Sequence, residues 1–355
     1  MGIGRIDKNL YIEDAVKESD IQFLDVRQTD AVIYGLHEPD KPGPFCRMPD
    51  DVARKVSTGV ANLARQTSGG RVRFRTDSSY VAIRAEQLGR NLMSHMPFLG
   101  SSGFDCYLRM EGKEVYCGSF VPHTNRKDGY ESILHFPDRQ LREVTINFPL
   151  YDQVDALYLG VQQDAVIQHP RPYRIQTPVV FYGSSITQGG CASRPGNSYE
   201  AILSRRMDFD YQNFGFSGSA LGEETMARYL AGLDMSIFVL DYDYNAPDTD
   251  HLRKTHWNFY QIIRQARPKI PIILITRPTH SIWPDIVRRE HANRQVIWET
   301  YCRAMESGDS NIYWVEGHDL FGDLGRDCTV DGAHPNDMGF YCMADGIGKV
   351  LCTVL

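Results

Sequence analysis

The sequence predicts two domains: a jelly-roll-like β-sandwich over residues 1–168, then a three-layer α/β domain with a parallel sheet over residues 169–355. Three observations lead to this fold class. The chain has 355 residues, which is longer than one average domain. Up to about residue 168 it alternates polar and apolar residues in short segments broken by turn residues. Beyond residue 178, apolar runs suited to strands alternate with segments suited to helices.

The first part of the chain contains a series of short strand candidates. In "RVRFRTDSSYVAIRAE" the alternation continues on both sides of "TDSS", which predicts two strands over 71–86 joined as a hairpin. Residues 51–71 satisfy neither the helical nor the strand period, so no structure is predicted for them. Several strands at this spacing are typical of a β-sandwich. Further strands are predicted at 104–110, 114–120, 130–136, 143–150 and 156–161.

A connector rich in Pro and Arg, "QHPRPYRIQTP", separates this region from one with a different pattern. Apolar segments of strand length then alternate with longer segments of helical length. Because parallel strands need long crossover connections, this alternation implies a parallel sheet covered by helices on both faces. Strands are predicted at 179–183, 211–215, 236–242, 270–276 and 311–317, and helices at 197–207, 223–233, 251–266, 285–305 and 337–351.

Composition argues against several classes of function. The formal net charge is −7 and the sequence pI is about 5.9, so we expect no nucleic-acid partner and no binding to an anionic membrane. No window approaches the ~18 apolar residues of a membrane span. The first residues lack the apolar segment of a signal peptide. The chain as given reads as cytoplasmic, or as periplasmic or secreted if a leader has been removed, so the sequence leaves the compartment open.

The eight cysteines are scattered along the chain, without a CxxC pair or a His/Cys spacing typical of a zinc site. We expect them to be reduced thiols. We also expect no metal and no cofactor.

Polar residues follow the predicted strands of the second domain at their carboxyl ends. "VVFYGSSIT" contains Ser184 and Ser185, "NFGFSG" ends at Gly218, "DYDYN" ends at Asn245, and "DGAHPND" precedes the last predicted helix. Because the carboxyl ends of parallel strands share one edge of the sheet, these groups are expected to meet there. Serine becomes a strong nucleophile when an imidazole accepts its proton and a carboxylate holds that imidazole. The set therefore predicts a serine hydrolase.

These four stretches, in this order, resemble the sequence blocks of the SGNH, or GDSL-like, hydrolase superfamily. The resemblance covers nearly all of the second domain and implies a flavodoxin-like α/β/α fold. It implies that Ser185 is the nucleophile, His334 the general base and then acid, and Asp331 the partner that orients the imidazole. It also implies an oxyanion hole formed by the backbone N–H of Ser185, the backbone N–H of Gly218 and the side-chain amide of Asn245.

Two departures from the family pattern affect these assignments. Ser184 occupies the position of the usual Asp before the nucleophile, so two adjacent serines compete for one role. Position within the block assigns the role to Ser185, with Ser184 bracing the turn. The third block reads "DYNA", where glycine and a trailing Asp are common. This keeps the amide of Asn245 but changes its surroundings.

An N-terminal β-sandwich ahead of such a domain, with the phrase "GGCASRPGNSYEAILSRR", resembles a two-domain branch of the superfamily that includes carbohydrate esterases. The resemblance implies removal of a short acyl group, acetyl first of all, from a carbohydrate or a similar polyol through an acyl-enzyme. The expected partner is a small-molecule or oligosaccharide acyl ester. A lipid or thioester hydrolase of the same superfamily is the alternative within enzymes. A carbohydrate-binding protein without catalysis is the alternative outside them.

Four side chains near these blocks are candidates for substrate binding: Arg194, Arg277, His280 and Trp283. Aromatic and guanidinium groups suit stacking on a sugar and recognition of its hydroxyls. An Arg and a Trp in a long loop can equally pack that loop against the protein, and Arg194 can form an ion pair that holds its loop. The β-sandwich has three open roles: carbohydrate binding, a wall of the cleft, or a module through which homo-oligomers form.

Overall fold

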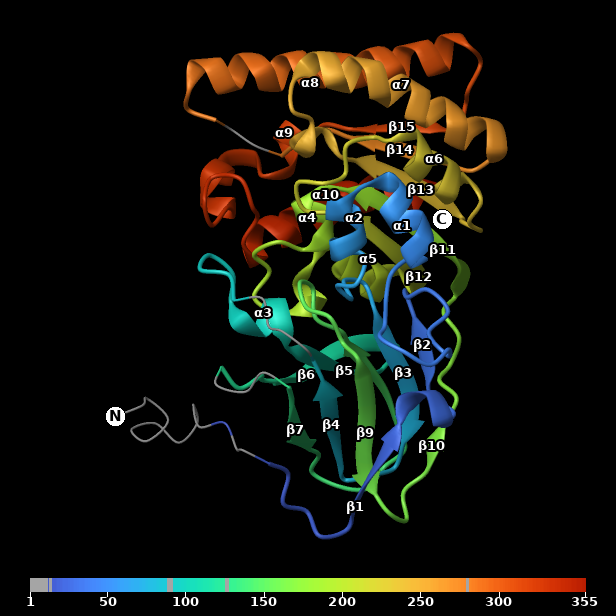
Figure 1. Cartoon of the computed structure of the whole chain (residues 1–355), viewed down its shortest axis with the longest axis vertical. Coiled ribbons are helices and arrows are strands. Elements are labelled where there is room, and N and C mark those ends of the chain that lie inside the picture. Colours follow the sequence, from blue (N-terminus) through green and yellow to red (C-terminus); the bar gives the residue numbers. More distant parts are fainter. Residues whose placement is uncertain (1–11, 13–14, 88–91, 125–127, 279–280) are drawn as a thin grey trace.

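The structure is a computed structural model that describes residues 12, 15–87, 92–124, 128–278 and 281–355. Two domains follow one another along the long axis of the molecule (Figure 1). The first is an antiparallel β-sandwich, and the second is an α/β domain with a parallel five-stranded sheet. This is the fold class that the sequence predicts.

Two antiparallel sheets form the sandwich. The first has the strand order β1-β9-β4-β7, and the second has the order β10-β3-β8-β5-β6, with β2 also paired to β3. Alternate apolar residues of both sheets, among them Phe74 and Leu159, meet in one buried core, as expected for strands with one inward face. The strands are β1 (Ile21–Asp25), β2 (Val32–Tyr34), β3 (Arg71–Thr76), β4 (Tyr80–Glu86), β5 (Phe104–Met110), β6 (Lys113–Phe120), β7 (Gly129–His135), β8 (Arg142–Asn147), β9 (Ala156–Gln162) and β10 (Ile167–Gln168).

The predicted hairpin over 71–86 is wrong. Both strands exist, but β3 pairs with β8 in one sheet and β4 pairs with β9 and β7 in the other. The turn between them passes from sheet to sheet because its serines bond to β9. Ser78 Oγ accepts a hydrogen bond from Gln162 N (3.2 Å), and Ser79 N donates to Gln162 Oε1 (3.0 Å). Alternation predicts the strands, but it does not predict their partners.

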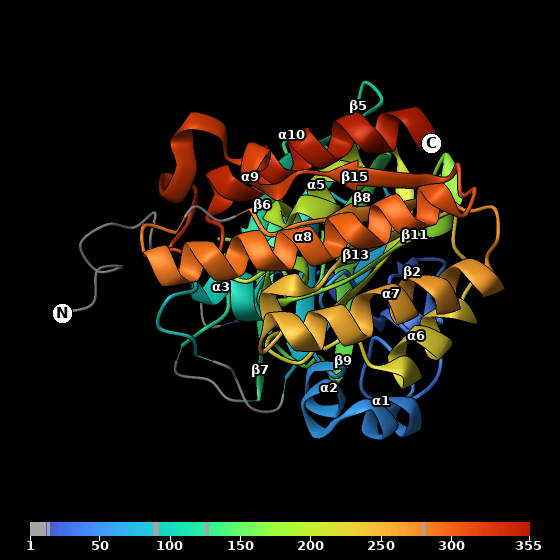
Figure 2. The same ribbon diagram turned by 90° about the horizontal axis from the view of Figure 1, so that it is seen from above.

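The second domain has a parallel sheet in the order β12-β11-β13-β14-β15. Alternate residues of these strands enter two separate cores, one on each face. Helices α6, α7 and α8 cover one face and α5 and α10 the other. Seen from above, α10 lies on one side of β15, and α8 with α7 on the other (Figure 2). Each predicted strand and helix of this domain is confirmed, with ends shifted by a few residues. The strands are β11 (Ile175–Gly183), β12 (Phe209–Gly215), β13 (Ile237–Asp241), β14 (Ile272–Ile275) and β15 (Ile312–Val315); the helices are α4 (Ser185–Gln188), α5 (Tyr199–Met207), α6 (Glu224–Ala231), α7 (Thr249–Ala266), α8 (Pro284–Glu306), α9 (Gly317–Leu320) and α10 (Asp337–Val354).

The strand order reverses at β11, whose two neighbours β12 and β13 both follow it in the sequence. In open parallel sheets such a reversal leaves a crevice at the carboxyl ends of the strands. Gly183 ends β11, and a Cβ at this residue would lie 2.0 Å from Thr187 Oγ1 and 2.4 Å from Asp241 O. Only glycine therefore lets α4 begin directly at the end of β11, in that crevice.

Residues 51–71, for which no structure is predicted, contain two short helices before β3 begins. Helix α1 (Asp50–Val56) fully buries Ala53, and helix α2 (Thr58–Leu63) fully buries Val60. Both residues enter the core beside α6 and α7, outside the sandwich. One buried residue per helix is too few to produce a visible period. Among all helices in the described part of the chain, none is long and apolar enough to cross a membrane.

A buried arginine joins the two domains. Arg47 is 3% exposed and donates to the carbonyl oxygens of Leu63 (2.7 Å) and Gln66 (2.8 Å). Across the junction it donates to the carbonyl oxygens of Asn213 (3.0 Å) and Gly215 (2.6 Å) at the end of β12. Burial lowers the pKa of Arg47 to about 9, which leaves the guanidinium protonated at neutral pH. Backbone carbonyls from both domains therefore replace water around one buried charge.

Two further arginines cross the same junction. Arg71 on β3 donates to Tyr173 Oη (2.8 Å) and forms an ion pair with Asp210 on β12. From the other side, Arg194 of the α/β domain donates to Asp105 Oδ2 on β5 (2.9 Å). The guanidinium of Arg71 is thus as buried as that of Arg47, whereas the Arg194 side chain is 19% exposed at the rim of the junction.

We predict that Arg47→Leu lowers the free energy of unfolding by about 3 to 5 kcal/mol, because it removes a buried guanidinium that donates to four backbone carbonyl oxygens at the junction. Arg47→Lys should lower the free energy of unfolding by less, because the ammonium keeps the positive charge. Some loss remains, because an ammonium cannot donate to four carbonyl oxygens as the planar guanidinium does. Urea titration followed by circular dichroism measures both changes.

The control is Arg65→Ala, which removes an arginine whose side chain is 51% exposed in a surface ion pair with Asp50. This change should cost at most about 1 kcal/mol. Equal losses in Arg47→Leu and Arg65→Ala would contradict the structural role of Arg47.

Candidate active site

The two serines after β11 have different environments. Ser184 is the N-cap residue of α4: its Oγ accepts a hydrogen bond from Ile186 N (3.2 Å), and its own N–H donates to Asp241 O (3.2 Å). Ser184 is completely buried. Ser185 is the first residue of the helix, and its hydroxyl faces an imidazole. Ser184 therefore caps the helix on which Ser185 is presented.

Ser185, His334 and Asp331 form a hydrogen-bonded line. Ser185 Oγ lies 2.9 Å from His334 Nε2, and His334 Nδ1 lies 2.7 Å from Asp331 Oδ2. Asp331 Oδ1 accepts hydrogen bonds from the backbone N–H groups of His334 (2.8 Å) and Ala333 (3.0 Å). Partial burial opposes ionisation, but together these hydrogen bonds outweigh it and lower the pKa of Asp331. An ionised Asp331 favours a proton on Nδ1, which leaves the Nε2 lone pair directed at Ser185.

The loop that carries Asp331 and His334 is anchored at both ends. Val330 N donates to His334 O (2.9 Å), which closes the loop on itself. Asn336 Oδ1 accepts a hydrogen bond from Gly339 N (3.0 Å) as the N-cap of α10. Since Asn336 caps the helix, the carboxylate of Asp331 is available to the imidazole.

The three predicted oxyanion donors lie on α4 and two loops. Ser185 N belongs to the first turn of α4, where backbone N–H groups have no acceptor within the helix. Gly218 is exposed and has a φ of +63°; its N–H donates to Asn245 Oδ1 (3.2 Å). Asn245 Nδ2 donates to Phe216 O (2.9 Å). The structure therefore brings Gly218 and Asn245 together, and in this state each has a protein acceptor.

Residues of the first domain contact α4, the helix that carries Ser185. Tyr151 Oη donates to Ser185 O (3.1 Å), and Gln188 Nε2 at the end of α4 donates to Leu150 O (3.2 Å). Gln188 Oε1 accepts a hydrogen bond from Ser217 N (3.0 Å) in the glycine block. The sequence carries no signal for these contacts, because each joins segments of different domains or different loops.

The predicted substrate-binding arginines are both engaged with protein groups. Arg277 is 4% exposed and donates to Asp243 O (2.9 Å), so it supports the loop that carries Asn245. The Arg194 side chain is 19% exposed and pairs with Asp105 across the domain junction. In this structure both guanidinium groups hold loops of the rim in place.

The other two candidates follow β14. Trp283 precedes α8 and is 61% exposed, so its ring is open to solvent. His280 lies outside the described residues. A substrate contact by either remains a prediction.

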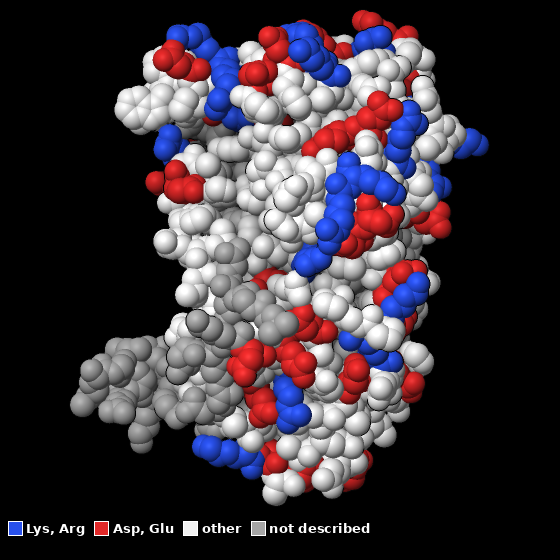
Figure 3. Space-filling view, in the orientation of Figure 1, with Lys and Arg blue, Asp and Glu red and all other residues white. Residues whose placement is uncertain are grey.

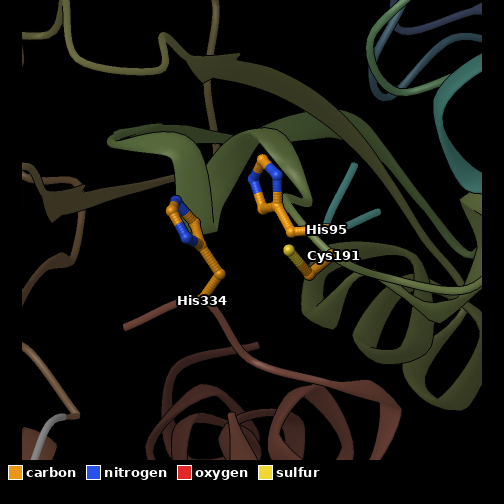
Figure 4. A group of neighbouring side chains, drawn as sticks. All are labelled: His95, Cys191 and His334. Carbon is orange, nitrogen blue, oxygen red and sulfur yellow. The ribbon is translucent and has the colours of Figure 1, made fainter. Parts of the chain in front are cut away.

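Two side chains without a sequence signal lie beside His334. His95 comes from the loop before α3 (Phe98–Ser102) in the first domain, and its ring centre is 5.7 Å from that of His334. Cys191 follows α4 with a φ of +75°, which is uncommon for a residue other than glycine. Burial, with the Asp331 carboxylate nearby, raises the pKa of Cys191 to about 12. Figure 4 shows the Cys191 sulfur directed toward the two imidazole rings. The eight cysteines are all free thiols in this structure, as expected.

Solved structures share the two-domain architecture over nearly the whole chain. A protein of Bacteroides ovatus described as a GDSL-like lipase is 27% identical, with a TM-score of 0.85 over 94% of this chain and 98% of that chain. The salicylyl-acyltransferase SsfX3 of a tetracycline biosynthetic pathway is 19% identical, with a TM-score of 0.78 over 96% and 99% of the two chains. The acetyl xylan esterase Est2A of the rumen bacterium Butyrivibrio proteoclasticus is 14% identical, with a TM-score of 0.61 over 94% and 98%. At 19% and 14% identity, the acyltransferase and the acetyl xylan esterase show only that this chain shares their fold.

Family comparisons cover both domains. No curated protein sequence matches the chain significantly. The family described as the N-terminus of SGNH-hydrolase-type esterases matches residues 21–167. The GDSL-like Lipase/Acylhydrolase family matches residues 176–352, which include the serine, the histidine and the aspartate of the hydrogen-bonded line. The chain therefore belongs to the GDSL-like lipase/acylhydrolase family of carboxylic ester hydrolases, with the N-terminal domain of the SGNH-type esterases.

Proposed function

We propose that this ester hydrolase removes short acyl groups, acetyl first of all, from a carbohydrate or a similar polyol through an acyl-enzyme on Ser185. The observation that carries the proposal is the alignment of Ser185 Oγ, His334 and Asp331, joined by hydrogen bonds of 2.9 and 2.7 Å. A hydroxyl, an imidazole and a carboxylate in this geometry are the components of a nucleophilic triad.

In the first half-reaction Ser185 Oγ attacks the carbonyl carbon of the ester, and its proton passes to His334 Nε2. The π electrons of the carbonyl move onto its oxygen as the new C–O bond forms. Asp331 stabilises the imidazolium through Nδ1. His334 then gives the proton to the departing alkoxide, so the sugar hydroxyl is released and the acyl group stays on Ser185.

The tetrahedral intermediate carries a negative oxygen that needs donors already in position. We assign this role to the backbone N–H groups of Ser185 and Gly218 and to Asn245 Nδ2. Losing one such donor typically costs about 3 to 4 kcal/mol of transition-state stabilisation. The oxyanion would replace Asn245 Oδ1 as the acceptor of the Gly218 N–H, and Phe216 O as the acceptor of Asn245 Nδ2.

In the second half-reaction a water takes the position of the leaving alcohol. His334 Nε2 accepts a proton from this water as its oxygen attacks the acyl carbon. Collapse of the second tetrahedral intermediate breaks the bond to Ser185 Oγ, and His334 returns the proton to that oxygen. Acetic acid is released, and the starting hydrogen bonds are restored.

The surroundings of Ser185 support a short acyl group. A long apolar acyl chain needs a channel or groove beside the nucleophile. Ser185 itself is only 6% exposed.

The surface supports an uncharged alcohol. On the face shown in Figure 3, Lys and Arg form small groups among Asp and Glu, separated by wide uncharged areas and without a broad field of one sign. A polyanionic substrate would favour a concentrated basic patch. The acetyl xylan esterase that shares this two-domain fold acts, by its name, on acetyl xylan. This likeness supports the carbohydrate part of the proposal.

We expect Ser185→Ala to lower kcat for p-nitrophenyl acetate at least about ten-thousandfold, because no other group in the triad can form the acyl-enzyme. Ser184→Ala serves as the matched control. It removes a helix cap and should cost about 1 kcal/mol of stability while kcat stays within about tenfold. A wild-type rate in Ser185→Ala would exclude Ser185 as the nucleophile.

We expect Asp331→Asn to lower kcat roughly ten-thousandfold with little change in KM. The amide can still accept from the backbone N–H groups, but opposite Nδ1 it favours the wrong tautomer of His334. Asp323→Asn, which alters an exposed acid in the segment before this loop, should keep wild-type kinetics. Steady-state assays of both variants test the role of Asp331, and equal rates in the two would refute it.

The substrate class is tested by measuring acid release from acetyl, butyryl and octanoyl esters and from acetylated xylo-oligosaccharides, with Ser185→Ala as the blank. We expect kcat/KM to fall at least about tenfold from acetyl to octanoyl, since Ser185 is only 6% exposed and a longer chain needs more room beside it. A preference for octanoyl would favour the lipid hydrolase. If no ester is turned over and a fluorophosphonate does not label Ser185, the carbohydrate-binding alternative holds.

A further inference from the structure

His95, Cys191 and His334 form a cluster of metal-ligating side chains. One ligand atom from each residue, a ring nitrogen or the sulfur, lies within 4.8 Å of those of the other two. The three residues come from three separate segments: the loop before α3, the turn after α4, and the loop before α10. Figure 4 shows the two rings and the sulfur around a common space.

The donor set matches zinc. Two imidazoles and one thiolate are ligands of Zn²⁺, with Zn–N distances of about 2.0 to 2.1 Å and a Zn–S distance of about 2.3 Å. In a tetrahedral site these lengths place the ligand atoms about 3.3 to 3.6 Å apart. The ligand atoms in this structure lie up to 4.8 Å apart, so they must move about 1 Å closer to one another to bind the ion. Exposed His95 can make such a movement by rotating its side chain.

The outer hydrogen bond of such a site is already present. His334 Nδ1 is bonded to Asp331 Oδ2 (2.7 Å), which leaves Nε2 as the nitrogen that can ligate. Metal-bound histidines commonly have their second nitrogen held by a carboxylate, which fixes the ring and raises its basicity. The same contact that prepares His334 to accept a proton thus also prepares it to bind a metal.

The backbone on both sides of the cluster is held in place. Met96, next to His95, is buried in the core that also contains Cys191 and Ala192. A Cβ on Gly100 of α3 would lie 2.1 Å from Ala192 O, so the helix after His95 lies directly against the turn that carries Cys191. The left-handed conformation of Cys191 directs its thiol toward the cluster. The site is therefore assembled across the junction between the two domains.

We propose that His95, Cys191 and His334 bind one Zn²⁺ ion, which reversibly inhibits the esterase. The ion occupies the Nε2 lone pair of His334, which lies 2.9 Å from Ser185 Oγ and must accept its proton. On binding, the Cys191 thiol releases its proton to solvent, and Ser185 Oγ or a water completes the tetrahedron. The inhibition rests on the proposed catalytic role of His334, whereas binding of the ion does not.

Binding and inhibition are measured separately. Equilibrium dialysis of the full chain carrying Ser185→Ala against buffered Zn²⁺ gives the stoichiometry and affinity without any esterase reaction. Hydrolysis of p-nitrophenyl acetate by the wild type, with Zn²⁺ increased and then removed by EDTA, gives the inhibition. We expect one ion per chain at micromolar Zn²⁺, loss of turnover over the same range, and full recovery with EDTA. Mg²⁺ should have no effect.

Substitutions identify the ligands. His95→Ala and Cys191→Ser, neither of which we place in the catalytic machinery, should keep turnover without zinc within about twofold. Each should raise the Zn²⁺ needed for half-inhibition at least about tenfold. The controls are His169→Ala and Cys352→Ser, which alter an exposed histidine and an exposed thiol elsewhere. They should leave the Zn²⁺ concentration for half-inhibition unchanged.

Two results would overturn the inference: absence of a micromolar site in the dialysis, or inhibition that His95→Ala and Cys191→Ser leave intact. If Ser185→Ala binds zinc through these ligands but the wild type hydrolyses no ester, the metal site stands and the proposed function fails.

Discussion

The buried guanidinium of Arg47 is the contact on which the edge of the sheet with the candidate active site depends. It belongs to the first domain, yet two of its four carbonyl acceptors, Asn213 O and Gly215 O, lie at the end of β12, in the first half of the glycine block. Its guanidinium carbon also lies 4.5 Å from the centre of the Phe216 ring, and Phe216 O is the acceptor of the Asn245 amide. A charge removed from water must keep its partners in position. The segment around Arg47, which precedes β3 in the chain, therefore fixes the backbone of the candidate oxyanion loop.

Most of the second domain can be predicted from the sequence, because its strands are buried on both faces and its helices are long. The sandwich is less predictable. The strands on both sides of "TDSS" alternate as a hairpin would, but Ser78 and Ser79 bond to Gln162 and direct β4 into the other sheet. Pairing depends on contacts between residues more than eighty positions apart, which a local pattern does not contain.

The candidate site, too, can be predicted from the sequence only where its residues stand in local motifs. Ser185, Asp331 and His334 each stand in a short motif next to a strand or helix end, so position in the sequence identifies them. Tyr151 and His95 reach the site from the other domain, and nothing in their local sequence marks them. Arg277 is the opposite case. Its place after β14 suggests a role at the rim, whereas its side chain is buried against Asp243.

The path of the chain between the domains limits how they can move. Strand β10 ends at Gln168 and β11 begins at Ile175, so six residues, which span at most about 20 Å, connect two elements that are each fixed in a sheet. Because the loop around Arg47, helix α3 and the turn at Tyr151 also cross the junction, a hinge at this connector would have to break all of them together. Several independent contacts therefore hold the two domains in one arrangement, which leaves the side chains and loops at the rim as the parts that can open the candidate site.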